Sequence, residues 1–148
     1  MYSITQLLGH APSGLYLLTG DWRGKAIERV CRREKARLIR IDASAVRSKR
    51  SFLRAASCAL ECPVWFGMNW DALSDCATDL SWMPAKTYLL LLGNVDAFAG
   101  SAPHHFQTAL EILEEAAEYW DRQGVPFYVL IATHSAPSDR TLEVVRAP

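Results

Sequence analysis

The sequence predicts an α/β fold, in which a small and mainly parallel sheet of about four strands has helices packed around it. The chain has 148 residues, of which half are hydrophobic and 22% are charged, as is typical of one globular domain. Short apolar runs alternate with amphipathic segments in the order β-α-β-α-α-β-α-β, a pattern typical of parallel strands joined by crossover helices. No apolar run approaches the ~18 residues that a membrane helix requires.

The first 41 residues predict a strand, a helix and a second strand. Residues 15–18 and 38–41 are rich in Leu and Ile, as expected of buried strands. Between them, residues 21–35 place apolar side chains at helical spacing among Arg and Lys residues, and Asp21 is a candidate N-cap. We expect this basic helix to cover one face of the sheet.

Two helices and a strand are predicted next. Residues 51–60 carry their apolar side chains on one face, and this helix must end by Pro63, because the residue before a proline disfavours the helical conformation. Residues 69–81 form a second predicted helix, which Pro84 closes. The apolar residues 87–92 then predict a buried strand.

The last third of the chain predicts a long helix, a strand and a loose tail. Apolar residues recur on one stripe of residues 106–123, and Gly124 is a typical helix terminator. Residues 127–131 predict the final strand. From residue 134 onward the chain is polar and contains two prolines, so we expect a loose tail there.

The net charge of zero is the sum of two oppositely charged halves. Residues 1–55 contain 12 Lys and Arg against 4 Asp and Glu, a net of +8, and residues 56–148 contain 4 against 12, a net of −8. Either the halves neutralise each other on folding, or the acidic half meets a basic partner. Because no nucleic-acid-binding motif accompanies the basic residues at 22–35 and 47–54, direct binding of nucleic acid is not expected.

The cysteine pattern predicts free thiols. Cys31, Cys58, Cys62 and Cys76 include no CxxC pair and no Cys/His set at zinc spacing. The N-terminal residues also lack the basic and apolar regions of a secretory signal. We therefore expect reduced cysteines in a cytoplasmic protein that holds no metal and no cofactor.

The helix predicted at residues 69–81 carries the most informative pattern, with Asn69 suited to cap it. Its apolar positions recur at spacings of three and four and should face the core: Trp70, Leu73, Ala77 and Leu80. Its outward positions then carry carboxylates one turn apart, at Asp71, Asp75 and Asp79. No Lys or Arg lies within residues 57–84, so nothing nearby in the sequence relieves the repulsion of these like charges.

Three interpretations of this acidic helix are open. A solvated face is the commonest role of surface carboxylates. The aromatic residues just before the helix, together with its negative charge, favour a site that binds a basic protein surface. A Mg²⁺-dependent enzyme using Asp71, Asp75 and Asp79 is the third. Because the sequence has no phosphate-binding loop and no nucleophile elbow, we do not expect an enzyme.

The segment at residues 63–76 reads Pro-Val-Trp-Phe-Gly-Met-Asn-Trp-Asp-Ala-Leu-Ser-Asp-Cys. It resembles the signature of the barstar family, the intracellular inhibitors of small microbial ribonucleases. The resemblance covers about residues 36–133, leaving residues 1–35 as an N-terminal extension of one strand and one helix and residues 134–148 as a tail. It implies a single, non-enzymatic domain that blocks the active site of a small basic ribonuclease one-to-one, with a monomer favoured.

The resemblance also implies roles for single residues. Asp75 would take the place of an RNA phosphate in the ribonuclease active site, and Asp71 would add a second acidic contact. Trp65 would pack against the catalytic histidine of the enzyme. The other implied partner-binding residues are Asn69, Ser74, Thr78 and Glu118.

The sequence departs from the family pattern at three contact positions. Ser74 and Leu80 stand where the family has tryptophans, and Tyr119 stands where it has an acidic residue, so that Glu118 is the neighbouring carboxylate. Because function resides in the site rather than in the fold, an immunity or regulatory protein with a target other than a ribonuclease is the alternative. Pro84 matches a proline that is cis in the family.

Overall fold

The computed structural model describes residues 1–63, 66–133 and 141–148. Its strands are β1 (Tyr2–Ser3), β2 (Gly14–Thr19), β3 (Arg37–Asp42), β4 (Tyr88–Gly93), β5 (Phe127–Ala132) and β6 (Val144–Arg146). Its helices are α1 (Ile4–His10), α2 (Ala26–Arg33), α3 (Lys49–Ala59), α4 (Trp70–Ala77), α5 (Asp96–Ser101) and α6 (Pro103–Arg122).

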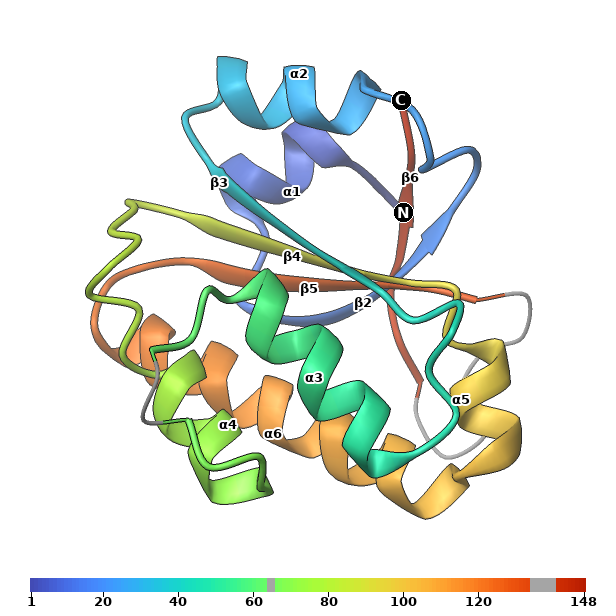
Figure 1. Ribbon diagram of the computed structural model, residues 1–148. Helices are drawn as coiled ribbons and strands as arrows, with labels where there is room; N and C mark the ends of the chain where they lie inside the picture. The colour runs from blue at the N-terminus through green and yellow to red at the C-terminus, as the bar shows by residue number, and fades with distance from the viewer. Residues whose placement is uncertain (64–65, 134–140) are drawn as a thin grey trace.

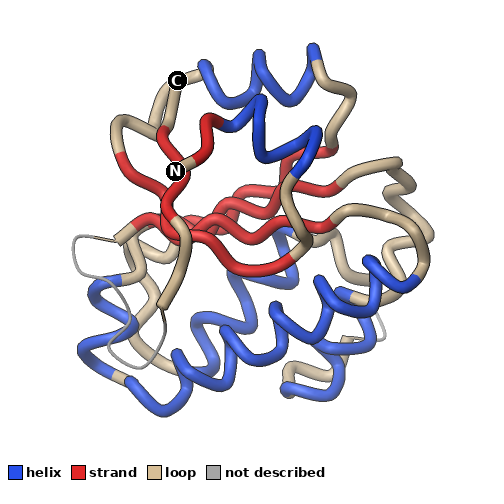
Figure 2. The backbone as a smooth tube through the Cα atoms, turned by 180° about the vertical axis from the view of Figure 1, so that it is seen from behind, coloured by secondary structure: helices blue, strands red, loops and turns tan. Residues whose placement is uncertain are grey.

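The strands of the described residues form one six-stranded sheet in the order β1-β6-β2-β5-β4-β3. All of its strand pairs are parallel. The helices make a layer on each face, with α1 and α2 on one side and α3 to α6 on the other (Figure 1). Figure 2 shows the same three layers from behind. The predicted α/β class is confirmed, with six strands in place of about four.

The N-terminal extension contributes two strands and two helices, not the one strand and one helix that we predicted. Residues 2–10 add β1 and α1. A capping box begins α1: the N–H of Gln6 donates to the Ser3 hydroxyl at 3.1 Å, and the N–H of Ser3 donates to Gln6 Oε1 at 2.8 Å. Such short elements depend on the rest of the fold for their stability, so their own sequence is a weak signal.

Helix α2 covers its face of the sheet as expected, but it begins later than predicted. Its buried residues, Ile27, Val30 and Cys31, pack against the core. Asp21 does not cap the helix, because its carboxylate accepts the N–H of Arg23 at 3.0 Å in the preceding turn. Lys25 occupies the N-cap position and makes no side-chain capping bond.

The middle of the chain follows the prediction with four corrections. Helix α3 begins at 49 rather than 51, because Ser48 and Ser51 form a capping box. Helix α4 ends at 77 rather than 81, and Leu80 has a φ of +51°, which lies outside the helical range. Helix α5 was not predicted. The peptide bond before Pro84 is trans, as most such bonds are, so the cis bond implied by the family does not occur.

The described part of the tail, residues 141–148, contains a strand rather than a loose end, and residues 134–140 lie outside the described residues. Strand β6 pairs with β1 on one side and β2 on the other, and Val145 is fully buried. The N–H of Ala147 also donates to the carbonyl of Thr19 at 2.8 Å. The outer edge of β2 would otherwise present unpaired backbone groups, and residues 144–146 satisfy them.

Hydrophobic layers lie on both faces of the sheet. Every residue of β4 and β5 is buried, because helices cover both sides of these central strands. The larger cluster lies beneath α3, α4, α5 and α6, and the smaller one beneath α1 and α2. Among the described residues, no helix is long and apolar enough to cross a membrane.

Candidate protein-binding site

Helix α4 begins at the predicted cap. The Oδ1 atom of Asn69 accepts the N–H of Ala72 at 2.7 Å, and its Nδ2 atom donates to the carbonyl of Gly67 at 3.2 Å. Asp71 lies in the first turn, where a carboxylate complements the helix dipole. The cap therefore sets where the helix starts and which of its side chains face outward.

The apolar side of α4 packs into the core as predicted. Leu73 and Ala77 are fully buried. Trp70 is half-buried, and its ring centroid lies 6.1 Å from that of Phe52 on α3 and 6.2 Å from that of His105 on α6. Helix α4 is therefore held between its two neighbours on this side of the sheet.

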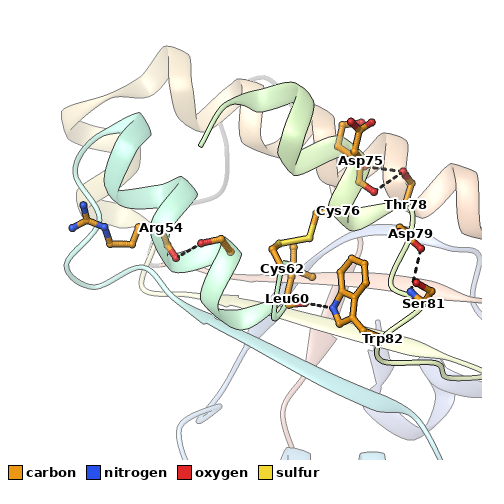
Figure 3. The surroundings of a disulfide bond; sticks show 11 residues. Arg54, Leu60, Cys62, Asp75, Cys76, Thr78, Asp79, Ser81 and Trp82 are labelled. Carbon is orange, nitrogen blue, oxygen red and sulfur yellow. Dashed lines mark hydrogen bonds between the residues drawn. A yellow bond between two sulfur atoms is a disulfide. The ribbon is translucent and has the colours of Figure 1, made fainter. Parts of the chain in front are cut away.

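The acidic stripe, which we define as Asp71, Asp75 and Asp79, has its first two residues on the opposite side of α4 and its third just beyond the C-cap residue Thr78. All three side chains are exposed. Asp79 accepts the N–H of Ser81 at 3.2 Å. Within the part of the chain that the structure describes, the carboxylates of Asp71 and Asp75 have no hydrogen-bond or ion-pair partner. Figure 3 shows the Asp75 carboxylate at the outer side of the helix.

The chain around the acidic stripe and the neighbouring helix α6 are also negative, whereas α3 places Lys49 Nζ 5.6 Å from the ring centroid of Trp70 at the start of α4. Residues 57–84 contain no Lys or Arg, and the neighbouring helix α6 contains five acidic residues and one basic residue. The two helices are joined at their C-terminal ends, where the indole N–H of Trp120 donates to the carbonyl of Ala77 at 2.8 Å. Such a field attracts a positively charged surface.

The other predicted contact residues lie on two elements. Ser74 and Thr78 are half-buried on α4, and the Thr78 hydroxyl donates to the Ser74 carbonyl at 2.7 Å. Glu118 is exposed on α6, the helix that packs against α4. Trp65 lies outside the described residues. One short helix therefore carries most of the predicted site, and the fold supplies Glu118 from another.

A disulfide joins Cys62 to Cys76, which corrects the expectation that all four cysteines are reduced. Their Cα atoms are 6.1 Å apart, a distance that a disulfide spans. Cys31 and Cys58 are free, and burial raises the pKa of the Cys31 thiol to about 11. The pairing joins the end of α3 to α4 (Figure 3). Two cysteines 14 residues apart match no familiar spacing, so only the packing of these helices reveals the bond.

No three His, Cys, Asp or Glu side chains converge on a common point within residues 1–63, 66–133 and 141–148. On α4 the reason is geometric. Residues four apart on a helix point the same way but lie about 6 Å apart along its axis. The acidic stripe therefore presents a row of charges rather than a cage for one ion.

A separate cleft of about 280 Å³ lies at the carboxyl ends of the sheet strands. Its walls include Trp22 and Arg23 from the loop after β2 and Asn94 and Asp96 from the segment after β4. Thr133, at the end of β5, donates to Asp96. The cleft shares no residue with the acidic stripe, and its walls carry both charge signs.

Fold and site together define a small α/β protein that presents an exposed acidic helix. The family model described as Barstar (barnase inhibitor) matches residues 36–132, which include all of α4, and the chain belongs to this family. The predicted family is confirmed, and the match begins after the N-terminal extension. The family is one of inhibitors rather than enzymes.

No curated protein matches the chain. Among solved structures, the ORC2 protein of Aeropyrum pernix, in ADPNP–ADP complexes, is similar with a TM-score of 0.55 and 17% sequence identity. The similarity covers 88% of this chain but 38% of that one. It concerns the fold alone.

Proposed function

We propose that this protein is a one-to-one inhibitor of a small basic ribonuclease and that it acts by occlusion, without catalysis. The observation that carries the proposal is the acidic stripe, in which two exposed carboxylates lie on one short helix and a third follows directly after the C-cap of that helix. The family match supports the class of partner, because the family is described as inhibitors of barnase. A cytoplasmic location is part of the proposal.

The acidic stripe can replace the phosphates of an RNA substrate. A protein that binds RNA neutralises successive phosphates with cationic side chains. Asp71 and Asp75 offer two carboxylates about one helical turn apart on a fixed backbone, so little conformational freedom is lost when they bind. Asp75 would enter the ribonuclease active site, and Asp71 would contact a neighbouring cation.

The remaining contact residues adapt the site to a particular ribonuclease. Ser74 lies on α4 beside Asp75 in the sequence, Thr78 is the C-cap of that helix, and Glu118 on α6 would extend the contact. The family resemblance adds Trp65, which lies outside the described residues. Because serine is small, position 74 leaves room for a larger side chain of the partner than a tryptophan would. The negative field around α4 would steer the two proteins together, most strongly at low salt.

The alternative is an immunity or regulatory protein on the same scaffold whose target is not a ribonuclease. The changes at Ser74 and Tyr119 support this alternative, because these positions match partner contacts in the family. Leu80 is buried in the core and is not available to a partner. A Mg²⁺-dependent enzyme is not proposed, since the three aspartates of the stripe do not converge within the described structure.

Titration of the protein into a panel of small basic microbial ribonucleases tests the proposal. Ribonuclease activity should fall linearly and reach zero at a one-to-one ratio. Asp75→Ala should remove the inhibition, while Glu28→Ala on α2, on the opposite face of the sheet, should leave it intact. If no ribonuclease is inhibited at low salt, where charge attraction is strongest, the ribonuclease target is wrong and the alternative takes its place.

A further inference from the structure

The Cys62–Cys76 disulfide closes a covalent ring around the proposed binding segment. The two cysteines are 14 residues apart in the chain, and Asn69, Asp71 and Asp75 lie between them. The bond joins the segment after α3 to the last turns of α4 (Figure 3). Both ends of the segment are therefore tied to one point of the fold.

The end of the ring at α3 is anchored by backbone hydrogen bonds. Helix α3 ends in a Schellman motif. In this motif the N–H of Cys62 donates to the Ser57 carbonyl at 2.9 Å, and the N–H of Glu61 donates to the Cys58 carbonyl at 3.1 Å. The indole N–H of Trp82 donates to the C-cap carbonyl of the same helix at 2.8 Å. Cys62 is thus a fixed point to which another element can be attached.

Helix α4 depends on such attachments for its position. It has eight residues, and a helix of about two turns is marginal without tertiary contacts. Asn69 caps its start, and Trp120 holds the carbonyl of Ala77 at its end. Cys76 is fully buried and directly follows Asp75, so the disulfide holds α4 from its core side next to the central carboxylate.

We propose that the Cys62–Cys76 disulfide positions the acidic stripe, so that the oxidised protein binds its partner more tightly than the reduced protein does. This inference rests on the proposed binding function. A closed ring has fewer conformations than an open segment. Less conformational freedom is then lost on binding, and the affinity is higher.

Opening the ring requires a thiol reductant. Cys62 is partly exposed and Cys76 is buried, so a thiolate of a dithiol reductant attacks Cys62 Sγ, and Cys76 leaves as a thiolate and takes up a proton. The second thiol of the reductant then displaces Cys62, which is also protonated. Two electrons pass to the protein, which gains two thiols, and the reductant becomes a disulfide.

Titrations of oxidised and reduced protein into a cysteine-free ribonuclease test the inference. Reduction with dithiothreitol should weaken inhibition on the order of tenfold, as expected when a segment must be ordered on binding. Cys62→Ser should show the weaker inhibition with or without the reductant. Cys58→Ser, which removes an exposed free thiol, should respond to the reductant as the unchanged protein does.

Thiol alkylation in denaturant, which exposes the buried Cys31 and Cys76, checks that each sample is in the intended redox state. Two of the four cysteines should be labelled in the oxidised protein and all four in the reduced protein. Equal inhibition by two such samples would overturn the inference. If the protein still has four reactive thiols after oxidation with glutathione disulfide, the Cys62–Cys76 disulfide does not form, and the inference is overturned as well.

Hydrogen exchange of the isolated protein gives a readout that needs no partner. Reduction should speed exchange in α4 and leave β4 and β5 unchanged; unchanged exchange in α4 would overturn the positioning role. If neither state inhibits any ribonuclease, the proposed function fails, while faster exchange in α4 on reduction still supports the positioning role of the disulfide.

Discussion

The basic helix α2 and the acidic helix α4 lie on opposite faces of one sheet and use their charges differently (Figure 1). Beside α2, Arg40 donates to two backbone carbonyls of the preceding loop at 3.2 and 3.1 Å, and Arg33 pairs with Glu34 at 3.1 Å. On α4, Asp71 and Asp75 have no such partners within the described residues. Arg40, which lies on β3, therefore holds the loop before α2 in place, whereas the carboxylates of Asp71 and Asp75 are available to another molecule.

Net charge alone does not separate these two roles. Helix α2 mixes its arginines with Glu28, and Glu34 follows at its C-cap, so positive and negative groups are interspersed along that face. Residues 57–84 contain four acidic residues and no basic one. A run of one sign on a short helix gains little for the fold, because like charges one turn apart repel. The comparison therefore favours a binding role for the acidic stripe.

The largest effect should come from the buried side of α4. Leu73→Ala removes a fully buried side chain and should lower the free energy of unfolding by about 2–5 kcal/mol, measured by chemical denaturation. Ile27→Ala, at a matching buried position of α2, should cost a similar amount. A loss at Leu73 that is far smaller than the loss at Ile27 would show that burial does not hold α4 in place.

Asp75→Ala should act on binding instead of stability. The loss of a central interfacial charge should weaken binding by about 2 kcal/mol or more. The barnase–barstar pair is one of the complexes that define this range, so the figure comes from the family. The midpoint of thermal unfolding should hardly change, because the side chain is exposed. Arg32→Ala on α2 should leave the binding free energy within about 0.5 kcal/mol of that of the unchanged protein. A strong loss of affinity in this variant would show that α2 also contributes to binding.

Removal of the α4 cap should have an intermediate effect. Asn69→Ala loses the acceptor for the N–H of Ala72 and should lower the free energy of unfolding by about 1 kcal/mol, with weaker inhibition as well. Ser48→Ala, which removes the cap of α3, should cost a similar amount of stability and leave inhibition intact. Denaturation and titration of both variants measure this, and equal inhibition by the two would contradict a positioning role for Asn69.

The smallest effect should come from the exposed ion pair beside α2. Arg33→Ala should change the free energy of unfolding by no more than about 1 kcal/mol, since the side chains of Arg33 and Glu34 are 63% and 35% exposed. Added salt should likewise change stability little while it weakens inhibition, because salt screens the attraction between the acidic stripe and its partner. Thermal unfolding and titration at several salt concentrations compare the two effects. Salt-independent inhibition would contradict a site that depends on charge.

Much of the candidate site follows from helical periodicity. The cap at Asn69 and the outward direction of Asp71 and Asp75 depend on residues within one turn of each other, so the sequence predicts them correctly. The attachment of α4 to α3 and α6 could not be predicted, because Cys62 and Trp120 lie outside the helix, 14 residues before Cys76 and 43 residues after Ala77. Glu118 reaches the same side of the sheet only because α6 packs against α4.

The sequence by itself determined the α/β class, the four main strands and the acidic helix, because each produces a local pattern of apolar and polar residues. Only the tertiary structure decided that residues 144–146 form a strand between β1 and β2, that α5 precedes α6, and that Cys62 meets Cys76. These features are short or join residues far apart in the chain. Their stability comes from neighbours that the fold supplies, and so their own residues carry too little signal to predict them.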